Sequence, residues 1–127
     1  MAVQAVAKGV KISPRKVGVV AALVRGRTVA DAVTILEHVP RRASALAVKK
    51  VIESASANAE HNHGLKPGTL NIVSISVSPG ERMKRARSRS HGQVNPFQRR
   101  TSHIRVVVDG EIRPIKKPAR TAEKKEA

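Results

Sequence analysis

Two short segments, residues 70–77 and 104–108, carry the apolar pattern of β-strands, and a long connection separates them. This connection, residues 78–103, greatly exceeds the usual loop length of about four to six residues, and it is neither apolar nor a Gly/Ser linker. A dense cationic run begins in it, with members Arg82, Lys84, Arg85, Arg87, Arg89, Arg99, Arg100 and Arg105. A core cannot bury so many unpaired guanidinium groups, so the connection is either disordered or projects from the domain. We interpret it as a long, charged β-hairpin.

An extended arm of this length would reach far beyond the domain that carries it. At about 3.3 Å per residue, residues 78–89 alone would span roughly 40 Å, whereas a small domain has a radius of gyration of about 13 Å. A lone two-stranded ribbon is only marginally stable in water. We therefore expect the projecting part of the hairpin to become ordered only against its partner.

The charge of the whole chain points to the nature of that partner. The 127 residues include 25 Lys and Arg against 9 Asp and Glu, which gives a net charge of +16 and substantial self-repulsion. A polyanion around the hairpin would supply the counter-charge, and nucleic acid is the favoured one. A membrane surface is a minor alternative, because the chain has no apolar run long enough to cross a bilayer and almost no interfacial aromatic residues.

The scarcity of aromatic residues and the absence of cysteine limit how the chain could bind nucleic acid and where it could function. Phe97 is the only aromatic residue, so the core should be aliphatic, and binding of single strands by base stacking is largely excluded. Recognition should act on phosphates, sugar hydroxyls and RNA shape. The chain has no cysteine, and its start lacks the pattern of a signal segment, so we expect a cytoplasmic protein.

The rest of the chain predicts a small α+β domain. A strand pattern from Val3 towards Ile12 precedes three helical patterns: one from Ser13-Pro14 to Gly26, one from Thr28 to Pro40, and the longest over residues 41–60. Ser13 should cap the first helix, and Thr28 with Asp31 resembles a capping box. The alternation of the next strand changes phase between Ile72 and Val73, which suggests a bulge.

We expect helices packed on one face of a small antiparallel sheet, with a long protruding basic β-hairpin and a basic C-terminal tail. One domain should cover residues 1–110 and include the hairpin at about 78–103, and residues 111–127 should form a flexible basic tail.

No residue pattern indicates an enzyme, a metal site or a cofactor. His61 and His63 have no nearby cysteine or paired carboxylates, so they are better explained as the polar end of a helix. The acidic residues stand singly, and there is no Ser-His-acid arrangement or glycine-rich phosphate loop.

Two smaller cationic features could contact RNA. The first helix begins with free amides beside Arg15 and Lys16, which favours phosphate binding over a plain helix cap. Lys49-Lys50 on the longest helix fits an RNA contact and a solvated helix face equally well.

Several motifs together resemble the large-subunit ribosomal protein L twenty-two family. In order, and essentially without gaps to about Val108, they are Ile12-Ser13-Pro14-Arg15-Lys16, Val24-Arg25-Gly26, Ser54-Ala55 with Ala57-Asn58-Ala59-Glu60, Lys84-Arg85, and Arg100-Thr101-Ser102-His103-Ile104. The resemblance implies a domain on the outer surface of the subunit, bound to 23S-type rRNA beside neighbouring ribosomal proteins, with an early role in assembly. It also implies that the hairpin runs inward, lines the nascent-peptide exit tunnel and ends at a locus of macrolide resistance.

The charge pattern and the resemblance together give a set of candidate residues. The predicted rRNA-binding residues are Lys11, Arg15, Lys16, Arg25, Arg82, Lys84, Arg85, Arg87, Arg89, Arg99, Arg100 and His103. The predicted tunnel-lining tip, in contact with the nascent peptide, comprises Arg89, Ser90, His91, Gly92, Gln93 and Val94. The tip departs from the usual bacterial pattern around Gly92, and Pro96, which lacks an N–H, should interrupt the ladder of the returning strand.

The main alternative is a DNA-compacting architectural protein, which would share the charge and the basic arm. Such a protein normally has a dimer interface and an apolar wedge at the arm tip, and Ser90-His91-Gly92-Gln93 offers no wedge. We therefore expect no obligate homo-oligomer. A secreted, membrane-active protein is disfavoured because a signal segment is absent and the charge lies on a ribbon.

Overall fold

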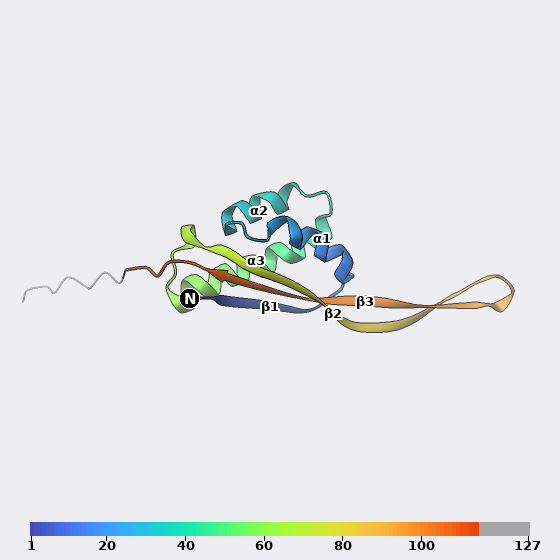
Figure 1. Cartoon of the computed structure of the whole chain (residues 1–127). Coiled ribbons are helices and arrows are strands. Elements are labelled where there is room, and N and C mark those ends of the chain that lie inside the picture. The colour runs from blue at the N-terminus through green and yellow to red at the C-terminus, as the bar shows by residue number, and fades with distance from the viewer. Residues whose placement is uncertain (115–127) are drawn as a thin grey trace, which may run out of the picture.

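The computed structural model describes residues 1–114 and has the predicted α+β class: three helices packed on a three-stranded antiparallel sheet (Figure 1). The elements are β1 (Val3–Val10), α1 (Pro14–Val24), α2 (Val29–His38), α3 (Arg42–His63), β2 (Asn71–Ser88) and β3 (Val94–Asp109), with short 3₁₀ turns at Pro67–Thr69 and Ser90–Gly92. The strand order is β1-β3-β2, so the last strand is central. The helices all lie on one side of the sheet: α1 and α3 pack on it, and α2 packs against these two helices (Figure 1).

The core between the helices and the sheet is aliphatic, as the composition predicts. The central strand turns Ile104, Val106 and Val108 inward, and all three are fully buried. On α3, Ala55 and Ala59 are also fully buried, and their small size lets the helix lie close to the sheet. Each buried Val, Leu or Ile side chain contributes about 1.5–3 kcal/mol.

Local signals set most of the helix ends. The Thr28 side chain accepts a hydrogen bond from the Asp31 N–H at 3.2 Å, which confirms the predicted cap of α2. Ser13 occupies the N-cap position of α1, but its side chain makes no capping hydrogen bond, so that part of the prediction is wrong. The longest helix continues to His63 and ends at Gly64, whose φ of 62° is the left-handed conformation that glycine adopts without strain.

The C-terminal side of the domain extends past its predicted end at residue 110. The Lys66 N–H donates to the Glu111 carbonyl at 2.8 Å, and the Arg113 N–H donates to the Gly64 carbonyl at 2.8 Å. The Arg113 guanidinium also lies 3.0 Å from Glu60 on α3. Residues 111–113 are therefore attached to the body, and the remainder of the predicted tail, residues 115–127, lies outside the described residues.

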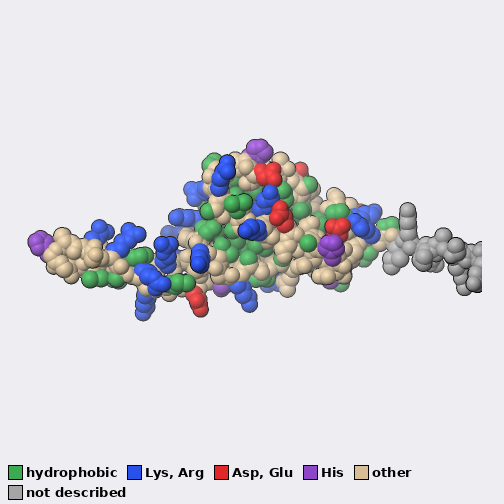
Figure 2. Space-filling model, turned by 180° about the vertical axis from the view of Figure 1, so that it is seen from behind, with side chains coloured by type: hydrophobic (Ala, Val, Ile, Leu, Met, Phe, Trp, Pro, Cys, Tyr) green, Lys and Arg blue, Asp and Glu red, His purple; other side chains and the backbone are tan. Residues whose placement is uncertain are grey.

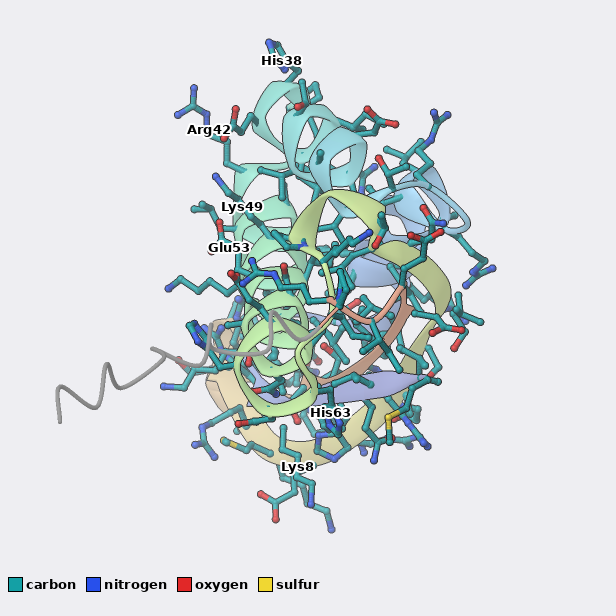
Figure 3. All side chains as sticks on the ribbon, turned by 90° about the vertical axis from the view of Figure 1, so that its left-hand side faces the viewer. Lys8, His38, Arg42, Lys49, Glu53 and His63 are labelled. Carbon is teal, nitrogen blue, oxygen red and sulfur yellow. The ribbon has the colours of Figure 1, made fainter. Side chains whose placement is uncertain are left out.

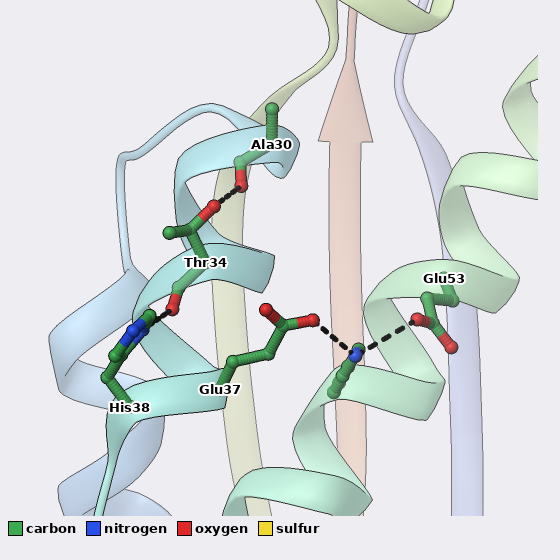
Figure 4. A network of polar contacts seen from close by, with 6 residues as sticks. Ala30, Thr34, Glu37, His38 and Glu53 are labelled. Atoms are coloured by element: carbon green, nitrogen blue, oxygen red, sulfur yellow. Dashed lines mark hydrogen bonds and ion pairs between the residues drawn. The ribbon is translucent and has the colours of Figure 1, made fainter.

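A bridge between α2 and α3 should make stability depend on pH at both extremes. Lys49 Nζ lies 2.9 Å from Glu37 Oε1 and 3.9 Å from Glu53 Oε1 (Figure 4). The hydrogen bond from Lys49 lowers the pKa of Glu37 below 4.5, and the same bond raises the pKa of Lys49 above 10.5. The Glu37 contribution is thus present above pH 4.5 and is lost as pH falls through the lowered pKa. The Lys49 contribution is present below pH 10.5 and is lost as pH rises through the raised pKa.

We expect the bridge to be removed by the substitution Lys49→Met, with a small loss of stability because its carboxylates are exposed. The difference in free energy of unfolding between the native chain and this variant should shrink at both ends of the pH window. Urea denaturation across pH would measure it, and a difference that stays constant from acid to alkaline pH would contradict the assignment.

Candidate nucleic-acid interface

The outer halves of β2 and β3 form a two-stranded ribbon that extends well past the body, which we call the arm (residues 81–100; Figure 1). Cross-strand pairs run from Arg82↔Arg100 to Ser88↔Val94. Every residue of the arm is exposed except Phe97, which is half-buried. Like charges face each other at Arg82 and Arg100, and directly opposed like charges destabilise a strand pair. The arm therefore has no apolar interior to set against its own repulsion.

We call the junction between the arm and the sheet the hinge (residues 79–82 and 101–103). The register of β2 shifts there, between Pro79 and Arg82, which marks a bulge. The Thr101 hydroxyl donates to the Glu81 carbonyl at 2.8 Å across this bulge. On the other side of β3, the Gly9 N–H donates to His103 Nδ1 at 3.1 Å, where β1 ends. The three strands are thus fastened together at the point where the arm begins.

The Ser102 hydroxyl in the hinge is buried and makes no hydrogen bond to any described residue. An unsatisfied buried polar group costs about 1–3 kcal/mol. We expect Ser102→Ala to leave the free energy of unfolding unchanged or to raise it by about 1 kcal/mol. The control Thr101→Ala should lower it by about 1 kcal/mol, because it removes the bond to Glu81. Chemical denaturation of both variants tests this, and a larger loss for Ser102→Ala would contradict it.

The ladder is not interrupted at Pro96, contrary to the sequence prediction. The Arg89 N–H donates to the Gln93 carbonyl at 2.6 Å, so these two residues form a hydrogen-bonding pair at the end of the ribbon. Such pairs alternate with non-hydrogen-bonding pairs, which places Ala86↔Pro96 among the latter. The nitrogen of Pro96 points away from β2, towards a side where no strand lies, so no ladder bond is lost.

The pairing register divides the side chains of the arm between two faces. The first face carries Met83, Arg85, Arg87, Asn95, Phe97 and Arg99. The second face carries Arg82, Lys84, Ala86, Ser88, Val94, Pro96, Gln98 and Arg100. Towards the tip, the second face is uncharged, because its cations all lie near the hinge.

A groove of about 750 Å³ lies where the arm meets the first turns of α1 and α3. Its walls contain Lys11, Ile12, Ser13 and Lys16, then Ala43 and Ser44 of α3, and Met83, Arg85, Arg87, Phe97, Gln98, Arg99, Arg100 and Thr101 of the arm and its hinge. Figure 2 shows Lys and Arg side chains along the arm and at its junction with the body. Six of the residues predicted from the sequence meet here: Lys11, Lys16, Arg85, Arg87, Arg99 and Arg100.

A second, smaller hollow of about 330 Å³ adjoins the start of α1. It is lined by Ser13, Pro14, Arg15 and Arg100, so a cation from β3 stands beside the start of the helix. The N–H groups of Lys16 and Val17 donate to the Ser13 carbonyl, which leaves the Arg15 N–H of this turn to an anion. Ser13 does not use its side chain to cap those amides. The Arg15 N–H, the helix dipole and the two cations together favour an anion at this position.

The sequence did not reveal the role of Phe97. The Arg87 guanidinium carbon lies 5.0 Å from the centre of the Phe97 ring, within the range of a cation–π contact. The ring also lines part of the groove wall, so its contact with Arg87 places that guanidinium beside the groove. A hairpin register drawn from the sequence would have placed Phe97 opposite Arg85 and two pairs from Arg87, on the same face of the ribbon, which is the signal that could have found it.

Other predicted residues lie outside the groove. The Arg25 guanidinium donates to the Ile75 carbonyl at 3.0 Å, so it serves the edge of β2. Arg82 and Lys84 lie on the second face of the arm. His103 uses Nδ1 within the hinge, which leaves the proton on Nε2 as its free donor. Lys49, for which the sequence allowed either an RNA contact or a solvated helix face, forms an ion pair with Glu37.

The predicted tip residues lie together at the far end of the arm. His91 and Gly92 have φ values of 57° and 72°, and the Gln93 N–H donates to the Ser90 carbonyl at 3.3 Å. This tight turn presents the side chains of residues 89–94 to the outside, because all of them are exposed.

Within residues 1–114, no three His, Cys, Asp or Glu side chains gather as a metal site. No helix in the same range is long and apolar enough to cross a membrane.

The fold, the basic arm and the groove fit both the ribosomal and the DNA-compacting interpretation, and comparison with known proteins separates the two. The family model described as ribosomal protein L22p/L17e matches residues 5–109. The chain belongs to this family. The large ribosomal subunit protein uL22 of Lactobacillus helveticus (strain DPC 4571) is similar to it, with 47% identity over 105 residues, 83% of this chain and 89% of that protein.

Membership of the L22p/L17e family settles the general role. The chain is a structural constituent of the large ribosomal subunit and is located in the ribosome, in the cytoplasm. The family is structural and not enzymatic. This confirms the family assigned from the sequence motifs.

Proposed function

We propose that the groove and the arm bind 23S-type rRNA by its phosphates. The observation that carries this proposal is an exposed, cationic ribbon that has no apolar interior and opens at its base onto six convergent cations. A polyanion enclosing the ribbon would supply the stabilisation that the arm lacks. RNA segments that converge on the groove would be held at a fixed spacing, which suits an early role in subunit assembly.

The cations on both faces near the hinge favour RNA on several sides of the arm. On the first face, Arg85, Arg87 and Arg99 point into the groove or its margin. On the second face, Arg82 and Lys84 would reach RNA that lies opposite. The Arg87 guanidinium, in contact with the Phe97 ring, is of a kind suited to a phosphate or a base face.

We propose further that the tip lines the nascent-peptide exit tunnel. A wall past which peptides of any sequence move should carry neither fixed charge nor large apolar side chains. The second face near the tip meets this condition with Ala86, Ser88, Val94 and Pro96. Arg89, just before the turn, and His91 within it would be the cationic and polar exceptions at the far end of the arm, where the peptide would pass closest.

Hydrogen exchange should show that the arm depends on RNA for its order. In the isolated protein, we expect amides of residues 82–100 to exchange with little protection and amides of the core strands to be well protected. In the assembled subunit, the ladder amides of the arm should become protected. Strong protection at the tip of the isolated chain would contradict this expectation.

Single cysteines can test the tunnel assignment, because the chain contains none. Ser88→Cys lies on the uncharged second face and Asn95→Cys lies on the first face, at the neighbouring position of the ribbon. With a short bifunctional reagent and a stalled nascent chain, we expect the first cysteine to cross-link to the peptide and the second to remain unlinked. A third cysteine at exposed Ala57, on α3, serves as a negative control. Absence of any peptide cross-link from Ser88→Cys would overturn the tunnel assignment.

A further inference from the structure

The two outer edges of the sheet differ in whether other parts of the chain cover their backbone groups. The body part of the β2 edge is covered by the segment before α2: the Ile72 N–H donates to the Arg27 carbonyl at 2.9 Å, and the Val29 N–H donates to the Leu70 carbonyl at 3.0 Å. The Arg25 guanidinium occupies the Ile75 carbonyl of the same edge. An edge protected in this way cannot accept another strand.

The outer edge of β1 has no such cover among residues 1–114. Within that range, β1 pairs only with β3, from Val3↔Val108 to Val10↔Ser102. In an antiparallel pair, alternate residues turn their N–H and C=O groups away from the partner strand. β1 therefore presents a row of backbone donors and acceptors to the outside, which is a template for a further strand.

An apolar groove of about 420 Å³ runs beside this open edge, between β1 and α3. Val6 and Leu46 border it and are 48% and 56% exposed, so apolar surface lies open beside the edge. Ala47 and Val51 add apolar surface, and Lys50 is the only charged residue that lines the groove. Val6 and Lys8 lie on the outer face of β1, and Lys8 points away from the helices (Figure 3).

We propose that an extended segment of another large-subunit protein docks here, adding to β1 as a fourth strand. Its backbone would satisfy the open edge, and alternate apolar side chains would enter the groove against Leu46 and Val51. An acidic residue of the segment would pair with Lys50, which makes no ion pair among the described residues.

The chemistry of the surface selects this occupant over two others. RNA offers phosphates to the N–H groups of the edge and 2′-hydroxyls to its carbonyls, but it would bring phosphate charge against the apolar groove. A second copy of the chain would bring together two molecules of net charge +16 each. An extended polypeptide with apolar and acidic residues avoids both costs. This inference concerns the side of the body away from the β2 edge and does not depend on how the arm or its tip is used.

Site-specific photo-cross-linking in purified large subunits tests the proposal. A photoreactive residue at Ser54, exposed on the wall of this groove, should link to one other ribosomal protein, within a segment that alternates apolar residues and contains an acidic one. The same residue at exposed Thr34 on α2 should give no such link. A matched pair of variants adds the specificity control: Leu46→Asp in the groove and Leu23→Asp on α1, which is 47% exposed.

We expect Leu46→Asp to lower the yield of the Ser54 cross-link at least tenfold and Leu23→Asp to leave it within about twofold, since only the first places a carboxylate in an apolar groove. Retention of each variant in salt-washed subunits is measured in the same samples, and it should be normal because rRNA binding is separate. Cross-links from Ser54 to rRNA, to a second copy or to residues 115–127 of the same chain would overturn the proposal. So would a yield that both variants leave unchanged.

Discussion

Replacement of Arg85, Arg99 and Arg100 by glutamine will sharply reduce both the affinity for large-subunit rRNA and its dependence on salt. Each phosphate neutralised by a cation contributes about 0.9 to the slope of log affinity against log salt. With six groove cations engaged, affinity should fall about 10³-fold between about 50 and 200 mM salt, and with three the fall should be about 40-fold. Filter binding of the isolated protein to rRNA fragments across this range measures both slopes.

A matched triple variant separates local binding from net charge. Glutamine at Arg27, Lys50 and Lys66 removes the same number of charges from the body. None of the three lines the cationic groove at the base of the arm. We expect its salt slope to remain close to that of the native chain. Equal losses for the two triple variants would show that only overall charge matters, and would refute phosphate binding by the groove.

Local chemistry explains which parts of the fold the sequence predicted. The Thr28 cap and the left-handed Gly64 act on residues next to them, so the local sequence is enough to predict both. The Pro96 prediction was wrong because its cost depends on hydrogen-bond parity across the ribbon. That parity is set by the closing pair at Arg89 and Gln93, several residues away, and no local pattern encodes it.

The candidate site was predicted in composition but not in arrangement. The cations of the arm follow from the charge pattern, whereas the groove exists because β1 ends at the hinge and delivers Lys11 and Lys16 to the base of the arm. Arg25 shows the converse case. The sequence identifies a cation, but only the fold reveals that its guanidinium donates a hydrogen bond to the Ile75 carbonyl on the β2 edge. Tertiary contacts of this kind decide whether a surface arginine is available for RNA.

The hinge should be the most sensitive point of the sheet to a single added methyl group. A Cβ on Gly80 would lie 2.5 Å from Thr101 Oγ1 and 3.1 Å from His103 Cε1. Thr101 cannot turn away freely, because it is buried and its hydroxyl donates to the Glu81 carbonyl at 2.8 Å. Overpacking of this kind costs about 1–3 kcal/mol. We expect Gly80→Ala to lower the melting temperature by roughly 5–20 °C, as followed by circular dichroism.

Two further variants identify the clash as the cause of this loss. Gly68→Ala is the matched control, because a Cβ there meets no atom within 4 Å, and it should leave the melting temperature nearly unchanged. The double variant Gly80→Ala with Thr101→Ala removes the clashing hydroxyl together with its hydrogen bond. Its loss should be smaller than the sum of the two single losses, with a coupling energy of about 0.5–3 kcal/mol. Strictly additive losses would show that Gly80 acts through something other than contact with Thr101, and the hinge would then need a different physical explanation.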